Sequence, residues 1–366
     1  MSHTEEKTTW EEPEVILESQ SPVCEIQAFV EKSDTCYYLY LWINFMSEEP
    51  QMRTCWICNR VKAPDTLDVA AMENGRAPAM PAEYVAHAPV GMELNEAKLS
   101  IVWLEEGDAA ALLYEEEIIC VVPGWSGYNG FCGYSKYAKG MGPYAWELTQ
   151  ALPVLSARVK QSQQFWDYFD TDYWPAVQDM HCKTLEAFFG KYERYFAIDG
   201  GEFPPKALLM GSAQNVAYAI TAGVSMIPMP KAEQYYGEEN KYFRRIELGF
   251  ATSMQHKKLC EHMGSTISAL AAMPWREITF LGHGHTIPFS NIKGFAAILF
   301  VNPKLIAGME VPSYEQFMEE DINLLWMIPI TQEEYDFVMQ RDVEALLASS
   351  ADTSQLHVFD GSRKFV

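Results

Sequence analysis

The chain has 366 residues, of which 48% are hydrophobic, and it carries a formal net charge of −23. This amount of apolar material is enough for one large domain or two smaller ones. The negative charge repels nucleic acid and anionic membrane surfaces, so we expect neither as a partner, and it attracts basic partners. The alternative is the acidity common to many soluble cytoplasmic proteins, in which case the charge identifies no partner.

The first 155 residues predict a β-rich domain behind a short tail. Residues 1–13 are polar and acidic, which is typical of a flexible N-terminus. From Glu14 to Phe45, patches of alternating aromatic and β-branched residues predict antiparallel strands. Residues 60–95 show no sustained period and predict a long irregular segment. Leu99–Trp103 and Ala110–Tyr114 then predict the two arms of a hairpin.

The turn of this hairpin is a candidate binding surface. It carries three carboxylates close together, Glu105, Glu106 and Asp108. Acidic clusters on exposed turns are usually solvated faces. The functional alternative is a docking surface for Lys and Arg side chains of a partner.

The glycine- and tyrosine-rich loop Gly124–Gly142 is a second candidate. It follows a strand expected at Ile118–Val122 and contains Trp125, Tyr128 and Tyr134. Aromatic side chains surrounded by polar residues are typical of interaction hot spots. The alternative is that the rings fold over a domain junction.

The second half of the chain alternates helical and strand patterns. A boundary near 150–200 divides the chain into expected domains at 14–155 and 156–366, and the class is α+β, with two lobes that are each a mixed or antiparallel sheet flanked by helices. The expected helices are Ala145–Ala151, Leu155–Phe169, Trp174–Tyr195 and Gln255–Met273, and the expected strands are Val216–Ala222, Arg245–Ala251, Ile278–Gly282 and Phe295–Val301.

The chain closes with a buried-strand pattern at Leu324–Ile330 that passes directly into a helix start. Thr331 is the expected N-cap, and Glu334 three residues later completes a capping box. The helix is expected over Tyr335–Leu347. No catalytic residue lies between strand and helix, so this run indicates a scaffold.

Two motifs could indicate metal or redox chemistry. Cys55-Trp-Ile-Cys58 has dithiol spacing, but no second ligand pair lies nearby and the stretch is strand-like, which favours ordinary buried thiols. His283 and His285, at i and i+2 on a strand, would face the same side and could share one metal in a hydrolase. The alternative is a structural role at the end of a strand, where the imidazoles form hydrogen bonds with nearby backbone groups. We favour this alternative and expect no metal and no cofactor.

The eight cysteines are scattered, and the N-terminus has no basic segment followed by an apolar one. Reduced thiols in a cytoplasmic protein are the expectation that follows. No apolar run approaches the roughly 18 residues of a membrane-spanning helix, so no membrane partner is expected.

Several short sequence segments resemble the suppressor-of-fused (Sufu) domain family, and their order and spacing are similar to those of its bacterial members. In the C-terminal half they are Thr221–Pro230, Arg244–Gly249, Pro274-Trp275, Gly282–His285 and Leu324–Tyr335. The N-terminal half resembles the extra region of the longer bacterial members at Val102–Asp108, Ile119–Trp125 and Phe203–Pro205.

The resemblance implies a non-catalytic protein that binds a protein or peptide partner. Eukaryotic Sufu proteins hold an extended peptide between two lobes, in effect by strand addition. Bacterial relatives are thought to be immunity proteins, and the acidic charge of this chain suits a basic toxin. The alternative is the metal-assisted hydrolase.

Overall fold

The structure is a computed structural model that describes residues 12–67, 69–350, 356–361 and 365. The chain forms two compact units, Met1–Asp167 and Tyr168–Val366. Both contain strands and helices, which confirms the α+β class. The expected flexible tail, residues 1–13, lies almost entirely outside the described residues.

The N-terminal unit contains two sheets, and their strands include those that the alternating patterns predicted. The first is antiparallel and contains β1 (Glu14–Gln20), β2 (Ile26–Lys32), β3 (Cys36–Ile43) and β4 (Gln51–Asn59). The second follows the order β5 (Leu99–Trp103), β6 (Ala110–Tyr114), β7 (Glu117–Val122), β8 (Tyr134–Ser135) and β9 (Trp146–Glu147). The predicted hairpin arms are β5 and β6. In its described residues, the expected irregular segment contains α1 (Val69–Glu73) and the 3-10 turn η1 (Ala82–Tyr84), and η2 (Glu96–Lys98) follows it.

Helix α2 (Leu152–Phe169) packs its apolar side chains against the second sheet. The prediction of a helix over Ala145–Ala151 was wrong. Trp146 pairs with Tyr134 in parallel β8 and β9, and its indole contacts the Phe131 ring at 4.8 Å. This tertiary pairing outweighs the local preference for helix.

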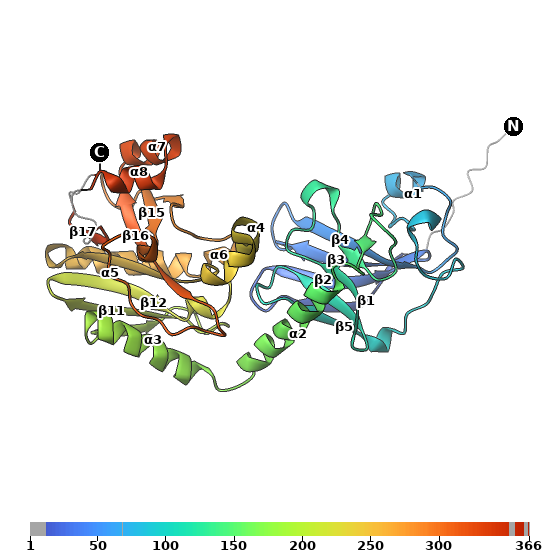
Figure 1. Cartoon of the computed structure of the whole chain (residues 1–366), viewed down its shortest axis with the longest axis horizontal. Helices are drawn as coiled ribbons and strands as arrows, with labels where there is room; N and C mark the ends of the chain where they lie inside the picture. The colour runs from blue at the N-terminus through green and yellow to red at the C-terminus, as the bar shows by residue number, and fades with distance from the viewer. Residues whose placement is uncertain (1–11, 68, 351–355, 362–364, 366) are drawn as a thin grey trace. The chain divides into compact units, whose positions relative to one another are not determined.

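The C-terminal unit contains one mixed sheet of eight strands (Figure 1). Strands β13 and β16 are parallel, β17 pairs in parallel with β13, and the other neighbours are antiparallel. The order is β10 (Arg194–Ala197), β11 (Ala207–Ala213), β12 (Val216–Ala222), β13 (Arg245–Ser253), β16 (Ile322–Ile330), β15 (Ala297–Val301) and β14 (Thr286–Pro288), with β17 (Val358–Phe359) beside β13.

Two helices cover opposite faces of this sheet, α3 (Trp174–Phe189) and α5 (Lys257–Leu270) (Figure 1). Alternation along β11 explains the arrangement. Leu209 belongs to the core that contains Leu185 and Phe189 of α3, whereas Leu208 lies against Gly264 of α5. The remaining short helices are α4 (Ala232–Tyr236), α6 (Met273–Arg276), α7 (Gln332–Gln340) and α8 (Val343–Ala348).

The helix start predicted at Thr331 is present in the structure. The Thr331 hydroxyl accepts from the Glu334 backbone N–H at 3.2 Å, and the Glu334 carboxylate accepts from the Thr331 N–H at 2.7 Å, which confirms the capping box. The expected single helix is divided between α7 and α8, because Asp342 caps a new helix by accepting from the Ala345 N–H at 2.6 Å.

Two other boundaries were wrong. The helix expected to reach Tyr195 ends at Phe189, where Gly190 has φ +81°, and the chain then enters β10. The strand expected at Ile278–Gly282 does not form, and β14 occupies Thr286–Pro288 instead.

Candidate functional site

The acidic turn between β5 and β6 is buried, contrary to the exposed position that we expected. Glu105, Glu106 and Asp108 are 4%, 5% and 3% exposed. Arg158 of α2 forms an ion pair with Glu106 at 3.0 Å, and the Arg53 guanidinium donates to the Asp108 carbonyl oxygen at 2.9 Å. An exposed docking surface therefore does not form here, because α2 and β4 cover a turn that would face solvent in an isolated hairpin.

The aromatic loop presents one ring to solvent. Tyr128 is 74% exposed and sits in a 3-10 turn, η3 (Tyr128–Gly130). Trp125 and Tyr134 are half-buried, and the Tyr134 ring lies 4.9 Å from that of the buried Phe131. A role of Trp125, Tyr128 and Tyr134 in partner binding remains a prediction, and Tyr128 is the most accessible of the three.

The two histidines do not share the face of a strand. They lie in a turn around Gly284, which has φ +83°. His283 Nδ1 accepts from the Asn302 N–H at 3.1 Å, while the His285 ring packs 4.6 Å from that of Phe280. Burial lowers the pKa of both imidazoles. Within the described ranges, no group of three His, Cys, Asp or Glu side chains is placed to hold a metal ion.

A well-connected buried acid is Glu247 on β13, which is 0% exposed. Its carboxylate accepts from the hydroxyls of Thr221 and Ser225, each at 2.6 Å. It also accepts from the backbone N–H groups of Gly223 at 3.0 Å and Ser225 at 3.1 Å. Four donors around one carboxylate satisfy its oxygens without solvent, so this arrangement fixes the turn after β12.

His181 of α3 closes the other side of this group. Its Nε2 lies 3.5 Å from the Ser225 hydroxyl and 3.6 Å from the Glu247 carboxylate, and the Tyr314 ring lies 5.6 Å away. Burial lowers the pKa of His181, although Glu247 acts in the opposite direction. Burial, followed by Glu247, raises the pKa of Tyr314 well above its usual range. Both rings therefore favour their neutral forms.

Glu320 binds the two arginines at the start of β13. It accepts from the Arg245 guanidinium at 2.7 Å and from Arg244 at 2.9 Å, and all three residues are buried. Arg245 also donates to the Ser225 and Met226 carbonyl oxygens at 3.1 and 2.6 Å. These bonds give the buried charges several partners each, as such groups require. Together with Glu247 they form a buried scaffold of hydrogen bonds and ion pairs.

The two ends of the eight-stranded sheet differ as sites for an added strand. The N–H of Ile198, just past β10, bonds to the Lys206 carbonyl oxygen, so by alternation the backbone groups of Tyr195 and Ala197 point away from β11. The same alternation directs Thr286 and Pro288 of β14 outward. Because proline has no N–H, β10 offers two outward donors and β14 offers one.

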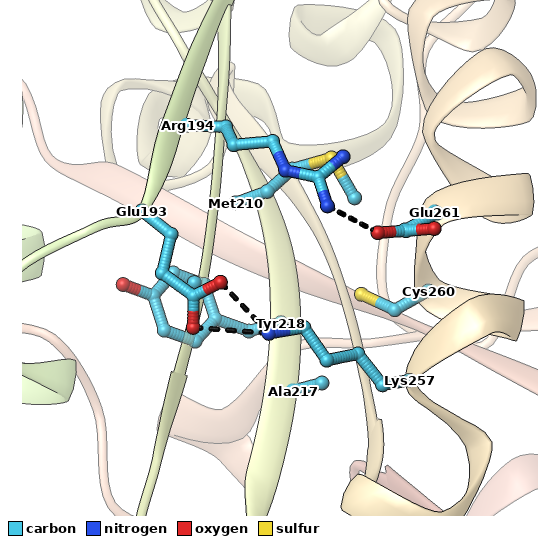
Figure 2. A pocket seen from close by; sticks show the side chains of 9 residues that line it. Glu193, Arg194, Met210, Ala217, Tyr218, Lys257, Cys260 and Glu261 are labelled. Atoms are coloured by element: carbon cyan, nitrogen blue, oxygen red, sulfur yellow. Dashed lines mark hydrogen bonds and ion pairs between the residues drawn. The ribbon is translucent and has the colours of Figure 1, made fainter.

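Strand β10 is fixed in place by α5. Figure 2 shows the small pocket between them, where Arg194 forms an ion pair with Glu261, and Glu193 forms one with Lys257 at 2.7 Å. The pocket has a volume of only about 10 Å³, which is water-sized. Burial raises the pKa of its thiol, Cys260, to about 12. The pocket is therefore part of the packing between β10 and α5, and it is too small for a ligand.

Comparison with known families finds a match in the C-terminal unit. The family model of Suppressor of fused protein (SUFU) matches residues 204–364, which include Thr221, Glu247 and Glu320. This part of the chain is therefore similar to the Suppressor of fused family. The matched Sufu region includes β14, whereas β10 precedes it.

Two solved Sufu structures are similar to the chain. One is a Sufu–Fu complex, with a TM-score of 0.33 and 12% identity over 52% of this chain and 89% of that one. The other is Drosophila Suppressor of Fused, with a TM-score of 0.27 and 13% identity over 44% of this chain and 39% of that one. None of the curated proteins matches the chain.

Two of the Sufu-like sequence segments meet at Glu247 in the fold. Thr221 and Ser225 belong to one segment and Glu247 to another, and the fold brings both to one carboxylate. The sequence did not single out His181, although one signal was present. His181 lies on the buried face of α3, four residues after Val177 and four before Leu185, and it is a polar residue in an otherwise apolar series.

Proposed function

We propose that this protein is a non-catalytic binding protein that adds an extended segment of a protein partner to its sheet at β10. The observation that supports it is the outward-facing backbone of Tyr195 and Ala197 on a strand that, among the described residues, has a sheet neighbour on one side only. Main-chain hydrogen bonds supply affinity in strand addition. The similarity of residues 204–364 to the Suppressor of fused family supports protein binding as the activity.

Side chains on β10 also suit an incoming strand. Phe196 is 42% exposed, and Ala197 is exposed and small. The ion pairs to α5 hold the strand before a partner arrives, so less conformational entropy is lost on binding. The rings of Tyr128 and its loop neighbours Trp125 and Tyr134 are proposed as additional contacts on the N-terminal unit.

The proposed partner is basic, and the finer proposal is an immunity protein that neutralises a basic toxin inside the cytoplasm. A net charge of −23 accelerates encounter with a cationic protein and disfavours acidic competitors. All eight cysteines are free thiols, which supports a reducing compartment. No helix in the described part of the chain is long and apolar enough to cross a membrane.

The hydrolase alternative has no observation in its favour. His283 and His285 lie on a turn, and each imidazole is engaged by a different neighbour. The buried carboxylate of Glu247 is closed off from solvent.

The test begins with affinity purification of the tagged full chain from its host and identification of any stoichiometric partner. The affinity of that partner is then measured for Ala197→Pro, which removes an outward N–H without breaking a bond to β11. We expect a loss of about tenfold or more, since a backbone hydrogen bond is lost and the partner strand is crowded.

Two controls accompany this variant. Ala197→Ser keeps the N–H and is expected to bind like the parent, while Thr286→Pro makes the same change at the opposite edge. Loss of binding in Thr286→Pro alone would transfer the site to β14. Recovery of no partner, or full affinity in both proline variants, would contradict strand addition.

A further inference from the structure

The N-terminal unit contains a pocket that the proposed function does not use. Its volume is about 550 Å³, within the range of binding pockets. It is lined by residues from three separate segments, 65–67, 81–84 and 141–143. Two of these lie in the long irregular segment of the sequence, and the third ends the aromatic loop.

The walls of this pocket are held by backbone hydrogen bonds. The Ala82 N–H donates to the Pro64 carbonyl oxygen at 2.9 Å, and the Lys139 N–H donates to that of Tyr84 at 2.8 Å. A Cβ atom at Gly142 would lie 2.9 Å from the Ala145 carbonyl oxygen, so the third wall is also closely packed. The pocket is therefore preformed, which lowers the entropy cost of binding.

Large apolar side chains at this pocket face solvent. Met141 is 70% exposed and Leu67 is 45% exposed, and both line it. Met72 is 46% exposed and accepts a hydrogen bond from Tyr144, which adjoins the lining residue Pro143. Grouped apolar exposure of this kind marks a contact surface, and methionine side chains adapt to varied partners.

The charge at the pocket has one sign. Asp65 and Glu83 are its charged lining residues, and neither forms an ion pair within the described part of the chain. No Lys or Arg is among the lining residues. This combination matches a ligand that carries an apolar group next to a cation.

We infer that this pocket binds a basic segment of the protein partner, with an apolar side chain against Leu67 and Met141 and a Lys or Arg beside Asp65 and Glu83. The inference rests on the proposed function for the existence of a protein partner. It places a second contact on the N-terminal unit, independent of β10. Two contacts on one chain would increase overall affinity through effective concentration.

The test uses arrayed 12-residue peptides that contain Leu, Met or Phe, in one set with two Lys or Arg residues and in a matched set with two Glu residues. The full chain is expected to select the basic set. The selected peptide should bind the Asp65→Asn/Glu83→Gln variant about tenfold more weakly, as expected for two partly exposed charge pairs. Met141→Asp should weaken binding to a similar degree or more.

The matched control is Glu48→Gln/Glu116→Gln, which removes the same charge from two exposed positions outside the pocket. It should keep the parent affinity. Equal weakening in both double variants would show that only the overall field acts, and absence of selection between the peptide sets would also overturn the inference. Ala197→Pro should leave the affinity of the peptide unchanged, so failure of strand addition and failure of the pocket are separable.

Discussion

The Thr221 hydroxyl donates a 2.6 Å hydrogen bond to the Glu247 carboxylate, and both side chains are fully buried. This bond joins β12 and β13 through their side chains, in addition to their backbone pairing. The same hydroxyl accepts from the Leu248 N–H at 2.8 Å. Thr221 therefore serves as donor and acceptor within a network that fixes the turn leading out of β12.

We predict that Glu247→Ala destabilises the C-terminal unit by about 3–5 kcal/mol, because four buried donors lose their acceptor. Urea unfolding followed by tryptophan fluorescence measures the change, and hydrogen exchange assigns it to this unit. Loss of less than about 1 kcal/mol would contradict the central role of the carboxylate.

The hydroxyl of Thr221 can be tested separately. Thr221→Val keeps the shape of the side chain and is expected to cost about 1–3 kcal/mol, since Leu248 N–H and Glu247 each lose a partner. Thr171→Val is the control at an exposed position, with an expected change within about 0.5 kcal/mol. Similar values for the two variants would contradict the buried network.

Stability at acidic pH should depend on His181. Burial lowers its pKa in the folded state, so below its ordinary value of about 6.5 the unfolded chain binds the proton more readily. The stabilising contribution is present above this pH and is lost as the pH falls, by up to about 1.4 kcal/mol per pH unit.

Urea unfolding at pH 7.5 and 5.5 measures this loss in the parent and in His181→Gln. The variant should lose less stability between the two values. Burial also lowers the pKa of His87, His283 and His285, but these contributions are common to both proteins and cancel. Exposed His262→Gln is the control and should behave like the parent. Equal losses in the parent and His181→Gln would exclude this histidine as the source.

Reversal of the Glu106 charge on the buried turn between β5 and β6 should destabilise the N-terminal unit. Glu106→Lys places a cation against Arg158, and we expect a loss of about 3–5 kcal/mol in the free energy of unfolding. Glu116→Lys, on the exposed turn between β6 and β7, is the control and should change stability by about 0.5 kcal/mol or less. Circular dichroism during thermal unfolding compares them. A stable Glu106→Lys variant with altered partner affinity would restore this turn as a binding surface.

The Cys55-x-x-Cys58 pair should be unreactive in the folded protein. Both thiols are buried, and burial raises their pKa well above the usual range. Cys132 and Cys182 are half-buried and should react first with iodoacetamide at pH 7.5. Mass spectrometry of time points gives the order. Early alkylation of Cys55 or Cys58, or a disulfide between them, would indicate a redox function.

Local patterns in the sequence determined the elements whose stabilising contacts lie a few residues apart. Thr331 and Glu334 predicted their capping box because both bonds connect residues three positions apart. The hairpin arms β5 and β6 followed from alternation and a turn. The α+β class likewise followed from local periodicity. The resemblance to the Sufu family followed from the order of short segments along the sequence.

Tertiary structure alone decided which polar groups are exposed and which meet. Glu106 is buried because Arg158, 52 residues away, covers the turn, and Glu247 meets Thr221 across 26 residues. Residues 194 and 195 were expected to end a helix, yet they belong to β10 because β11 offers a pairing edge. Burial and pairing depend on contacts between distant segments, and local periodicity contains no information about those contacts.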